Sequence, residues 1–184
     1  MSVDPADFYN NGMSWDEFIS SATHNIDRMK MFFDEFEFDE DTAVFFSSRS
    51  PLQVLVIAED WCPDVVQNVA MVAKIGEEVP GMEVSIVGRE DNPELMDLYE
   101  TEGKRRVPVI VFFDMTFREL ARWTGRSKAA DAWVFGEVLK DRSFKDMSED
   151  DLRAFNDEFD RRFKDTYGRE SLQEWMHLME DEDF

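Results

Sequence analysis

A single cysteine, Cys62, is the residue in this sequence whose type and position could support redox chemistry. It lies in the stretch EDWCPDVVQ, after the apolar run LQVLVIA and before a segment with helical apolar spacing. As the residue before Pro63, it is placed to be a helix N-cap, where free N–H groups and the helix dipole favour thiolate over thiol. The nearby carboxylates of Glu59, Asp60 and Asp64 oppose this effect through like charge. The sequence leaves the sign of the net effect open.

Other redox and metal chemistry has little support in the residue types present. One cysteine excludes a disulfide within the chain. The two histidines, His24 and His177, lie in opposite terminal segments, and neither has a second Cys or His at ligand spacing. We therefore expect no structural zinc site and no bound cofactor.

Composition limits the partners and the location. The 184 residues carry a net charge of -22, which argues against nucleic acid and anionic membrane surfaces, since phosphate binding needs clustered Lys and Arg. No apolar run approaches the roughly 18 residues of a membrane span, and the acidic start lacks a signal-peptide pattern. We expect a cytoplasmic protein. A strongly solvated surface explains the carboxylates, and a high-salt source remains an open alternative.

The elements that must position Cys62 follow from apolar patterns. Strands are predicted at 52–58, 82–88, 107–113 and 117–123, and helices from Pro63 to Val79, from Asn92 to Gly103 and from Ser127 onward. A right-handed crossover makes the first two strands parallel, and the short turn after Asp114 makes the last two antiparallel. The sequence therefore predicts an α/β fold with a mixed sheet and helices on both faces.

Helical segments flank this pattern. Ser14 and Glu17 form a capping box that opens one long amphipathic helix through Phe36, and the stretch up to Pro51 is predicted as a short helical turn or an irregular connection. From Ser148 a helix carries an aromatic stripe that Gly168 interrupts. We expect one domain over 1–184, with a core at about 52–140, a helical N-terminal extension at 14–50 and a helical C-terminal extension at 147–180.

The stretch VLVIAEDWCPD, followed by a helix, a strand, a helix and RVPVIVFFD, resembles the thioredoxin superfamily. The WCxD pattern and the later RWTGRSKAA resemble the longer bacterial and archaeal thioredoxin family proteins. The specific likeness covers about residues 52–135, and the terminal helices match in length and placement alone. It implies a thioredoxin-like α/β fold, with a mixed central sheet flanked by helices and extra helices at both ends.

The resemblance also implies a site. Cys62 is then the catalytic thiol, and the binding residues are Trp61, Pro63, Asp64, Arg106, Val107 and Pro108. In the family a proline at the position of Pro108 is cis, and the backbone before it faces the thiol. The alternative, a proline that starts an edge strand, fits poorly because VPVIVFF is too apolar for an exposed edge. The basic run 104–106 would lie beside Pro108, where it could offset the carboxylates or bind an anionic partner.

Two departures from the family pattern limit the chemistry. Thioredoxins release the mixed disulfide with a second cysteine three residues after the first, where this chain has Val65. The buried acid that the family carries six positions before the thiol is here Val56. We therefore expect no dithiol reduction of protein disulfides.

Three functions remain open. The first is monothiol thiol–disulfide exchange or redox sensing with a protein or a low-molecular-weight thiol or disulfide, regenerated by an external thiol such as glutathione or by a reductase. Val107 before Pro108 resembles the substrate-binding backbone of glutaredoxin-like proteins. The second is a redox-inactive module that binds a peptide or partner protein around Trp61, Cys62 and Pro108. The third is a structural oligomer element formed by the acidic surface and the aromatic helices. Each site residue also has a plain structural alternative: Cys62 is an inert small residue, Trp61 is core packing, Asp64 is a favourable carboxylate of the first helical turn, and Arg105 and Arg106 are ordinary surface charges.

Overall fold

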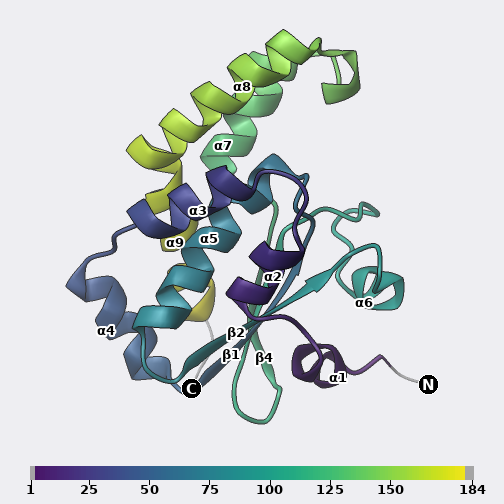
Figure 1. Ribbon diagram of the computed structural model, residues 1–184. Coiled ribbons are helices and arrows are strands. Elements are labelled where there is room, and N and C mark those ends of the chain that lie inside the picture. The colour runs from purple at the N-terminus through teal and green to yellow at the C-terminus, as the bar shows by residue number, and fades with distance from the viewer. Residues whose placement is uncertain (1–2, 181–184) are drawn as a thin grey trace. The chain divides into compact units, whose positions relative to one another are not determined.

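The computed structural model describes residues 3–180, which form two compact units (Figure 1). The first unit runs up to Gly125 and includes the residues from Trp175 on, and the second unit is Arg126–Glu174. No helix within residues 3–180 is long and apolar enough to cross a membrane. The single domain expected from the sequence stays a prediction, because the division into compact units does not decide whether they fold independently.

The first unit is built on the predicted mixed sheet. Its strands are β1 (Leu52–Ala58), β2 (Met82–Gly88), β3 (Val109–Phe113) and β4 (Glu119–Thr124), in the order β2-β1-β3-β4. β1 is parallel to β2 and antiparallel to β3, which is antiparallel to β4. The central strands β1 and β3 are buried along nearly their whole length, as their continuous apolar sequences require. The predicted α/β class and strand pairing are confirmed.

Two helices connect the strands of this unit. α5 (Pro63–Glu78) links β1 to β2, and Pro63 at its start suits the first helical position, where an N–H has no intrahelical partner. α6 (Pro93–Leu98) ends at Leu98, so the predicted extension to Gly103 is wrong. Beyond it, Thr101 and Lys104 exchange backbone hydrogen bonds of 3.0 Å across a tight turn. Gly103 adopts φ +69° in that turn, which explains the glycine without a longer helix.

The N-terminal region is four helices, where the sequence predicted one long helix and a short turn. They are α1 (Pro5–Asn10), α2 (Trp15–Ser21), α3 (Ile26–Glu35) and α4 (Glu40–Arg49). The capping box of Ser14 and Glu17 is present at the start of α2. The single long helix is wrong because the chain leaves the helical path between α2 and α3, where Asn25 has φ +53°. α1 was not predicted, and α4 is a full helix that begins at an Asp39 cap.

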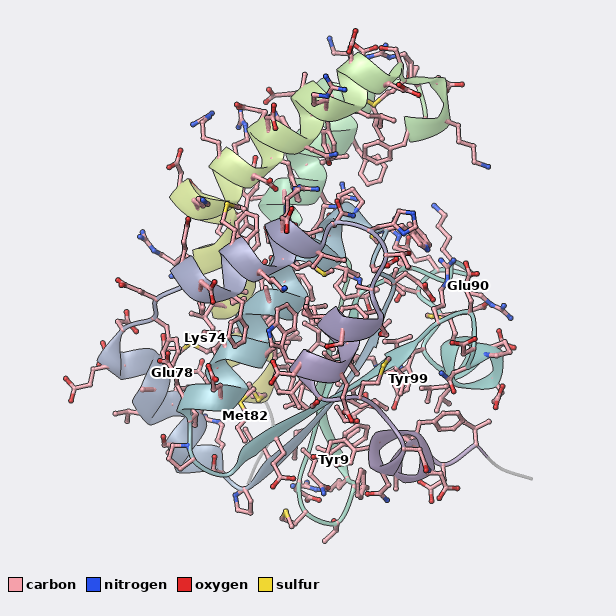
Figure 2. All side chains as sticks on the ribbon, viewed as in Figure 1. Tyr9, Lys74, Glu78, Met82, Glu90 and Tyr99 are labelled. Carbon is pink, nitrogen blue, oxygen red and sulfur yellow. The ribbon has the colours of Figure 1, made fainter. Side chains whose placement is uncertain are left out.

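α3 packs along α5 on one face of the sheet (Figure 1). Lys74 of α5 pairs with Glu78 at 3.0 Å one turn further along the same helix (Figure 2). Its ammonium also lies 5.0 Å from the ring centroid of Phe33 on α3. The long Lys74 side chain therefore covers the seam between the two helices while its charge stays paired.

Aromatic rings fill the part of the core formed by β3, β4 and the end of the chain. Trp175, in the middle of α9 (Gly168–Glu180), is fully buried. Its ring centroid lies 5.6 Å from that of Trp123 on β4 and 6.2 Å from that of Phe112 on β3. This packing fastens the last residues of the described chain to the sheet.

The second unit is helical. It contains α7 (Lys128–Trp133), a π-helical segment Val134–Leu139, a 3₁₀ turn Phe144–Asp146, α8 (Glu149–Arg162), a π-helical segment Phe163–Tyr167 and the first half of α9. Trp133 stacks on Phe155 and Phe159, with ring centroids 5.8 and 6.2 Å away. The predicted interruption at Gly168 is wrong, because the helix continues through the wider π-helical turn. A Cβ at Gly168 would lie 2.9 Å from the Phe163 ring, so glycine is needed for close approach.

Candidate thiol site

Cys62 is the N-cap residue of α5, with extended backbone angles of φ -82° and ψ 123°. Its N–H donates to the Glu59 carbonyl at 3.1 Å, and its own carbonyl accepts from Val65 at 3.1 Å. The residue therefore closes the loop after β1 and opens the first turn of α5. This places the sulfur beside N–H groups that begin a helix of sixteen residues.

A segment far along the chain meets the sulfur. The Cys62 thiol donates to the Val107 carbonyl, with the sulfur 3.5 Å from the oxygen. The bond between Val107 and Pro108 is cis, and β3 begins at Val109. Cys62, Val107 and Pro108 are all buried, and 8% of Cys62 is exposed. The structure thus brings together three of the residues that the sequence singled out.

Trp61 is exposed beside this buried group. Its exposed fraction is 43%, which is high for a tryptophan in a folded chain. The Arg89 guanidinium lies 5.0 Å from the Trp61 ring centroid and donates to the Arg105 carbonyl at 3.3 Å. Arg89, which follows β2, therefore links Trp61 to the chain that leads to Pro108.

Two of the three carboxylates near the thiol are engaged by other groups. Glu59 accepts a 2.9 Å hydrogen bond from the backbone N–H of Glu90, a residue that Figure 2 shows on the loop after β2. Asp60 accepts from the N–H groups of Thr23 and His24. Partial burial raises the pKa of Asp60, but these bonds and the His24 ring outweigh it, so the pKa lies below its ordinary value. Both carboxylates are therefore held by hydrogen-bond donors from other segments of the chain.

The third carboxylate, Asp64, is buried in the first turn of α5. Gln67 and Asn68, one turn further along, are also buried, and the Asn68 amide donates to the Asp64 backbone carbonyl at 2.9 Å. Gln67 and Asn68 were not among the residues predicted for the site. Their position among the valines of α5, on a helix with almost no polar face, was the available signal.

The basic run before Val107 is largely paired within the protein. Arg105 forms ion pairs with Asp97 on α6 and with Glu100, the latter at 3.4 Å. Lys104 is exposed, and Arg106 is half-buried directly before Val107. Part of the cluster expected to attract an anionic partner is thus neutralised by α6 and the residues after it.

A family model described as Thioredoxin matches residues 12–148. The chain belongs to the thioredoxin family. The match covers β1, α5, the loop with Cys62 and the whole sheet. No curated protein matches the chain.

Two crystal structures share this thioredoxin-family chain's fold over nearly its full length. An HIV epitope-scaffold is 16% identical with a TM-score of 0.69, and the match covers 98% of this chain and 100% of the other. A protein of unknown function, PA1234 from Pseudomonas aeruginosa, is 16% identical with a TM-score of 0.67, and the match covers 97% of this chain and 98% of the other. The likeness concerns the fold alone, and it extends over the terminal helices.

The positions where this thioredoxin-family protein departs from the dithiol pattern are both core positions. Val65 lies in the first turn of α5 and Val56 in the middle of β1, and neither is exposed to solvent. Val56 pairs with Ile86 and Ile110 on the neighbouring strands. Within residues 3–180, no three His, Cys, Asp or Glu side chains are grouped to hold a metal ion.

An open pocket of about 350 Å³ lies at the C-terminal end of β2, between α1 and the loop before α6. Phe8, Met13 and Val87 give it an apolar wall, and Asp7 and Asp91 lie at its side. Cys62 and Pro108 do not line this pocket. Sequence patterns did not indicate it, because α1 itself was not predicted.

Proposed function

We propose that the protein carries out monothiol thiol–disulfide exchange at Cys62. The Cys62 thiolate attacks one sulfur of a substrate disulfide, the substrate S–S bond breaks, and the leaving thiolate takes a proton from water. An external thiolate then attacks the substrate sulfur of the mixed disulfide and regenerates the Cys62 thiolate. One substrate sulfur is released as a thiol, and the external sulfur takes its place in a new disulfide with the other substrate sulfur. The number of disulfide bonds does not change, so the exchange needs no cofactor as oxidant or reductant.

The observation that carries the proposal is the place of the sulfur. It lies at the N-terminus of α5 and 3.5 Å from the Val107 carbonyl oxygen. A helix N-terminus favours the thiolate, which is the attacking form. An extended substrate could lie along the backbone at Val107 and reach the sulfur from the side of the exposed Trp61.

The presence of a single thiol determines how the mixed disulfide is released. Cys62 is the one cysteine of the chain, and a buried valine fills the position of a resolving cysteine. The mixed disulfide must therefore be released by an external thiol, such as glutathione, or by a reductase. A cytoplasmic location, which remains a prediction, would supply such thiols.

A redox-inactive module that binds a peptide or partner protein is the second candidate. The specific observation in its favour is that Trp61 is 43% exposed while Cys62 is 8% exposed. An exposed aromatic ring beside an almost covered sulfur suits recognition better than turnover. The narrower likeness to the longer bacterial and archaeal proteins with a WCxD pattern stays a prediction under either function.

The rate of Cys62 alkylation by iodoacetamide across pH separates the two candidates, with Cys62→Ser as the control for background labelling. We expect fast alkylation at neutral pH, and a glutathione mixed disulfide that forms and is then reduced by added glutathione. A thiol that titrates near about 8.5, as in a free peptide, and reacts slowly would support the binding module instead.

A further inference from the structure

The carboxylate of Asp60 accepts hydrogen bonds from the turn that separates α2 from α3. Its Oδ2 accepts from the Thr23 N–H at 2.6 Å and from the His24 N–H at 2.9 Å. The Thr23 hydroxyl lies 3.3 Å from the same oxygen, and the His24 Nδ1 lies 3.2 Å from Oδ1. A carboxylate with four such neighbours is fixed in position.

A second contact joins the same two segments through the backbone. The Asn25 side-chain amide donates to the Asp60 carbonyl at 2.8 Å. Arg28 on α3 donates to the Asn25 side-chain oxygen at 3.0 Å, which orients that amide. The turn 23–25 therefore holds both the side chain and the main chain of Asp60 by hydrogen bonds.

Asp60 directly precedes Trp61 and Cys62, so these hydrogen bonds act on the loop that presents the thiol. The Cys62 N–H bonds to Glu59 on the other side of Asp60. Movement of Asp60 would thus shift both the N-cap residue and its hydrogen-bond partner. The side chain of Asp60 is 16% exposed, so most of the carboxylate is shielded from solvent, although its partners Thr23 and His24 are exposed.

We propose that Asp60 is a positioning residue for Cys62, which acts by fastening the loop 59–62 to the turn 23–25. The fastening keeps the sulfur at the N-terminus of α5 and against Val107. An effect of Asp60 on the rate of exchange rests on the proposed thiol exchange, whereas its effect on the position of Cys62 does not.

If Asp60 acted on Cys62 only through its negative charge, its substitution would have the opposite effect on the thiolate. Removing a like charge close to a thiol favours the thiolate. Loss of positioning disfavours it, because the sulfur leaves the helix N-terminus. The charged groups nearest to Asp60 in this network are His24, Arg28 and Glu59, with Arg89 on the far side of Trp61. None of them is changed by a substitution at Asp60.

The pH profile of Cys62 alkylation tests the proposal. We expect Asp60→Ala to raise the pH midpoint by about half a unit, which is about a threefold lower thiolate fraction at neutral pH. Asp60→Asn keeps an oxygen that accepts from Thr23 and should give a smaller rise. A fall in the midpoint in both variants, or no change, would overturn the proposal.

A hydrogen bond to Asp60 can also be removed by a substitution in the turn 23–25, which leaves the carboxylate in place. Thr23→Pro removes the N–H that makes the 2.6 Å bond, and Ala22 before it already has the extended backbone that a following proline needs. Thr23→Ala, the matched control, keeps the N–H and loses the longer contact of the hydroxyl. We expect Thr23→Pro to reproduce the Asp60→Ala profile, Thr23→Ala to resemble the parent, and the two disruptive changes to be non-additive when combined.

Amide hydrogen exchange gives a readout that does not depend on reactivity. The Cys62 N–H should exchange about fivefold faster in Thr23→Pro than in Thr23→Ala. Equal exchange in both would contradict the fastening. If the parent formed no mixed disulfide, the proposed exchange would fail, while the alkylation midpoints and the amide rates would still decide the role of Asp60.

Discussion

The sulfur of Cys62 lies 3.5 Å from the carbonyl oxygen of Val107, although 45 positions separate the two residues along the chain. The contact joins the start of α5 to the segment that enters β3. In the exchange that we propose, a substrate disulfide would approach the sulfur along the backbone at Val107. Several expected outcomes rest on this arrangement.

Supplying a second thiol should create dithiol chemistry. The N–H of Val65 bonds to the Cys62 carbonyl at 3.1 Å, which brings the two residues into one helical turn. We expect Val65→Cys to form a disulfide with Cys62 under mild oxidation, detected by mass spectrometry as the loss of two hydrogens. The reduced double-thiol form should then gain insulin-type disulfide reduction, which we expect to be absent from the parent.

Val66→Cys is the matched control, because Val66 is equally buried one position further round α5. It should gain neither the disulfide nor the reductase activity. Absence of activity in an oxidisable Val65→Cys protein would show that the valine at position 56, in place of an acid, also blocks exchange.

The charge of the substrate should affect the rate of mixed-disulfide formation. The chain carries a net charge of -22, and Arg105 is already paired with Asp97 and Glu100. At low salt, cystamine should react with Cys62 about tenfold faster than the anionic dithiodiglycolate, with the neutral 2-hydroxyethyl disulfide between them. Near 1 M salt, where charges are screened beyond about 3 Å, the three rates should converge. A faster anionic reagent at low salt would assign an attractive role to Lys104 and Arg106.

Trp61 should matter for exchange more than for stability. Its ring is 43% exposed, with one cationic neighbour at 5.0 Å. We expect Trp61→Ala to lower the free energy of unfolding by about 1 kcal/mol at most. It should slow exchange with a peptide disulfide about fivefold or more, measured by quenched-flow mass spectrometry. Trp61→Phe should retain most of the rate, and an unchanged rate in Trp61→Ala would exclude a contact between this ring and the peptide.

The sequence was sufficient for the parts of the fold that depend on local patterns. A continuous apolar run such as LQVLVIA is typical of a central strand, and Pro63 marks the start of α5. The pairing of the strands followed from connection lengths. These signals are local or topological, and they positioned Cys62 at the end of β1.

The features that were not predicted from the sequence depend mostly on contacts between residues that are distant along the chain. The break between α2 and α3 exists because His24 bonds to Asp60, 36 positions later. The apolar spacing from Trp15 to Phe36 continues through the break and therefore predicted one helix. At Gly168 the signal is local instead: the glycine leaves room for the Phe163 ring, five positions earlier, and does not end the helix. At the site, the burial of Asp64 and the pairing of Arg105 required the packed structure.

Gly12 should be sensitive to substitution for a steric reason. A Cβ at this position would lie 2.2 Å from the Ser85 hydroxyl oxygen, which donates to the Tyr9 carbonyl at 2.7 Å. We expect Gly12→Ala to lower the free energy of unfolding by about 1 to 3 kcal/mol, measured by urea denaturation. Gly136→Ala lies in the helical segment Val134–Leu139, where no atom outside the adjacent backbone lies within 4 Å of the new Cβ. It should leave the free energy of unfolding unchanged or raise it by up to about 1 kcal/mol.

The Gly12→Ala/Ser85→Ala double variant tests the cause. Removing the hydroxyl relieves the closest contact, so the double variant should lose less stability than the sum of the single changes. Additive losses would show that the damage comes from the remaining contacts with Val87 and the Ile86 carbonyl, at 3.1 and 3.2 Å.

Alkaline stability should depend on Tyr9, which Figure 2 shows on α1 beside β2. Burial raises the pKa of its hydroxyl to about 12, and the Glu83 carboxylate adds to the shift. Because the folded pKa exceeds the ordinary value of 10, the folded state binds the proton more tightly. Stability from this group is full below pH 10 and is lost as the pH rises towards 12. Between these values, Tyr9→Phe should lose less stability than the parent, measured by urea denaturation at each pH.

The outer edge of β2 is partly covered by the N-terminal segment, which affects how readily the protein can aggregate. Met13 and Ile86 exchange two backbone hydrogen bonds of 2.8 Å, and the Tyr9 hydroxyl approaches the Glu83 carbonyl at 3.4 Å. Unpaired strand edges are templates on which other chains can polymerise. The pairing of Met13 with Ile86 therefore occupies part of the outer edge of β2, and we expect removal of the residues up to Met13 to make the protein more prone to aggregate.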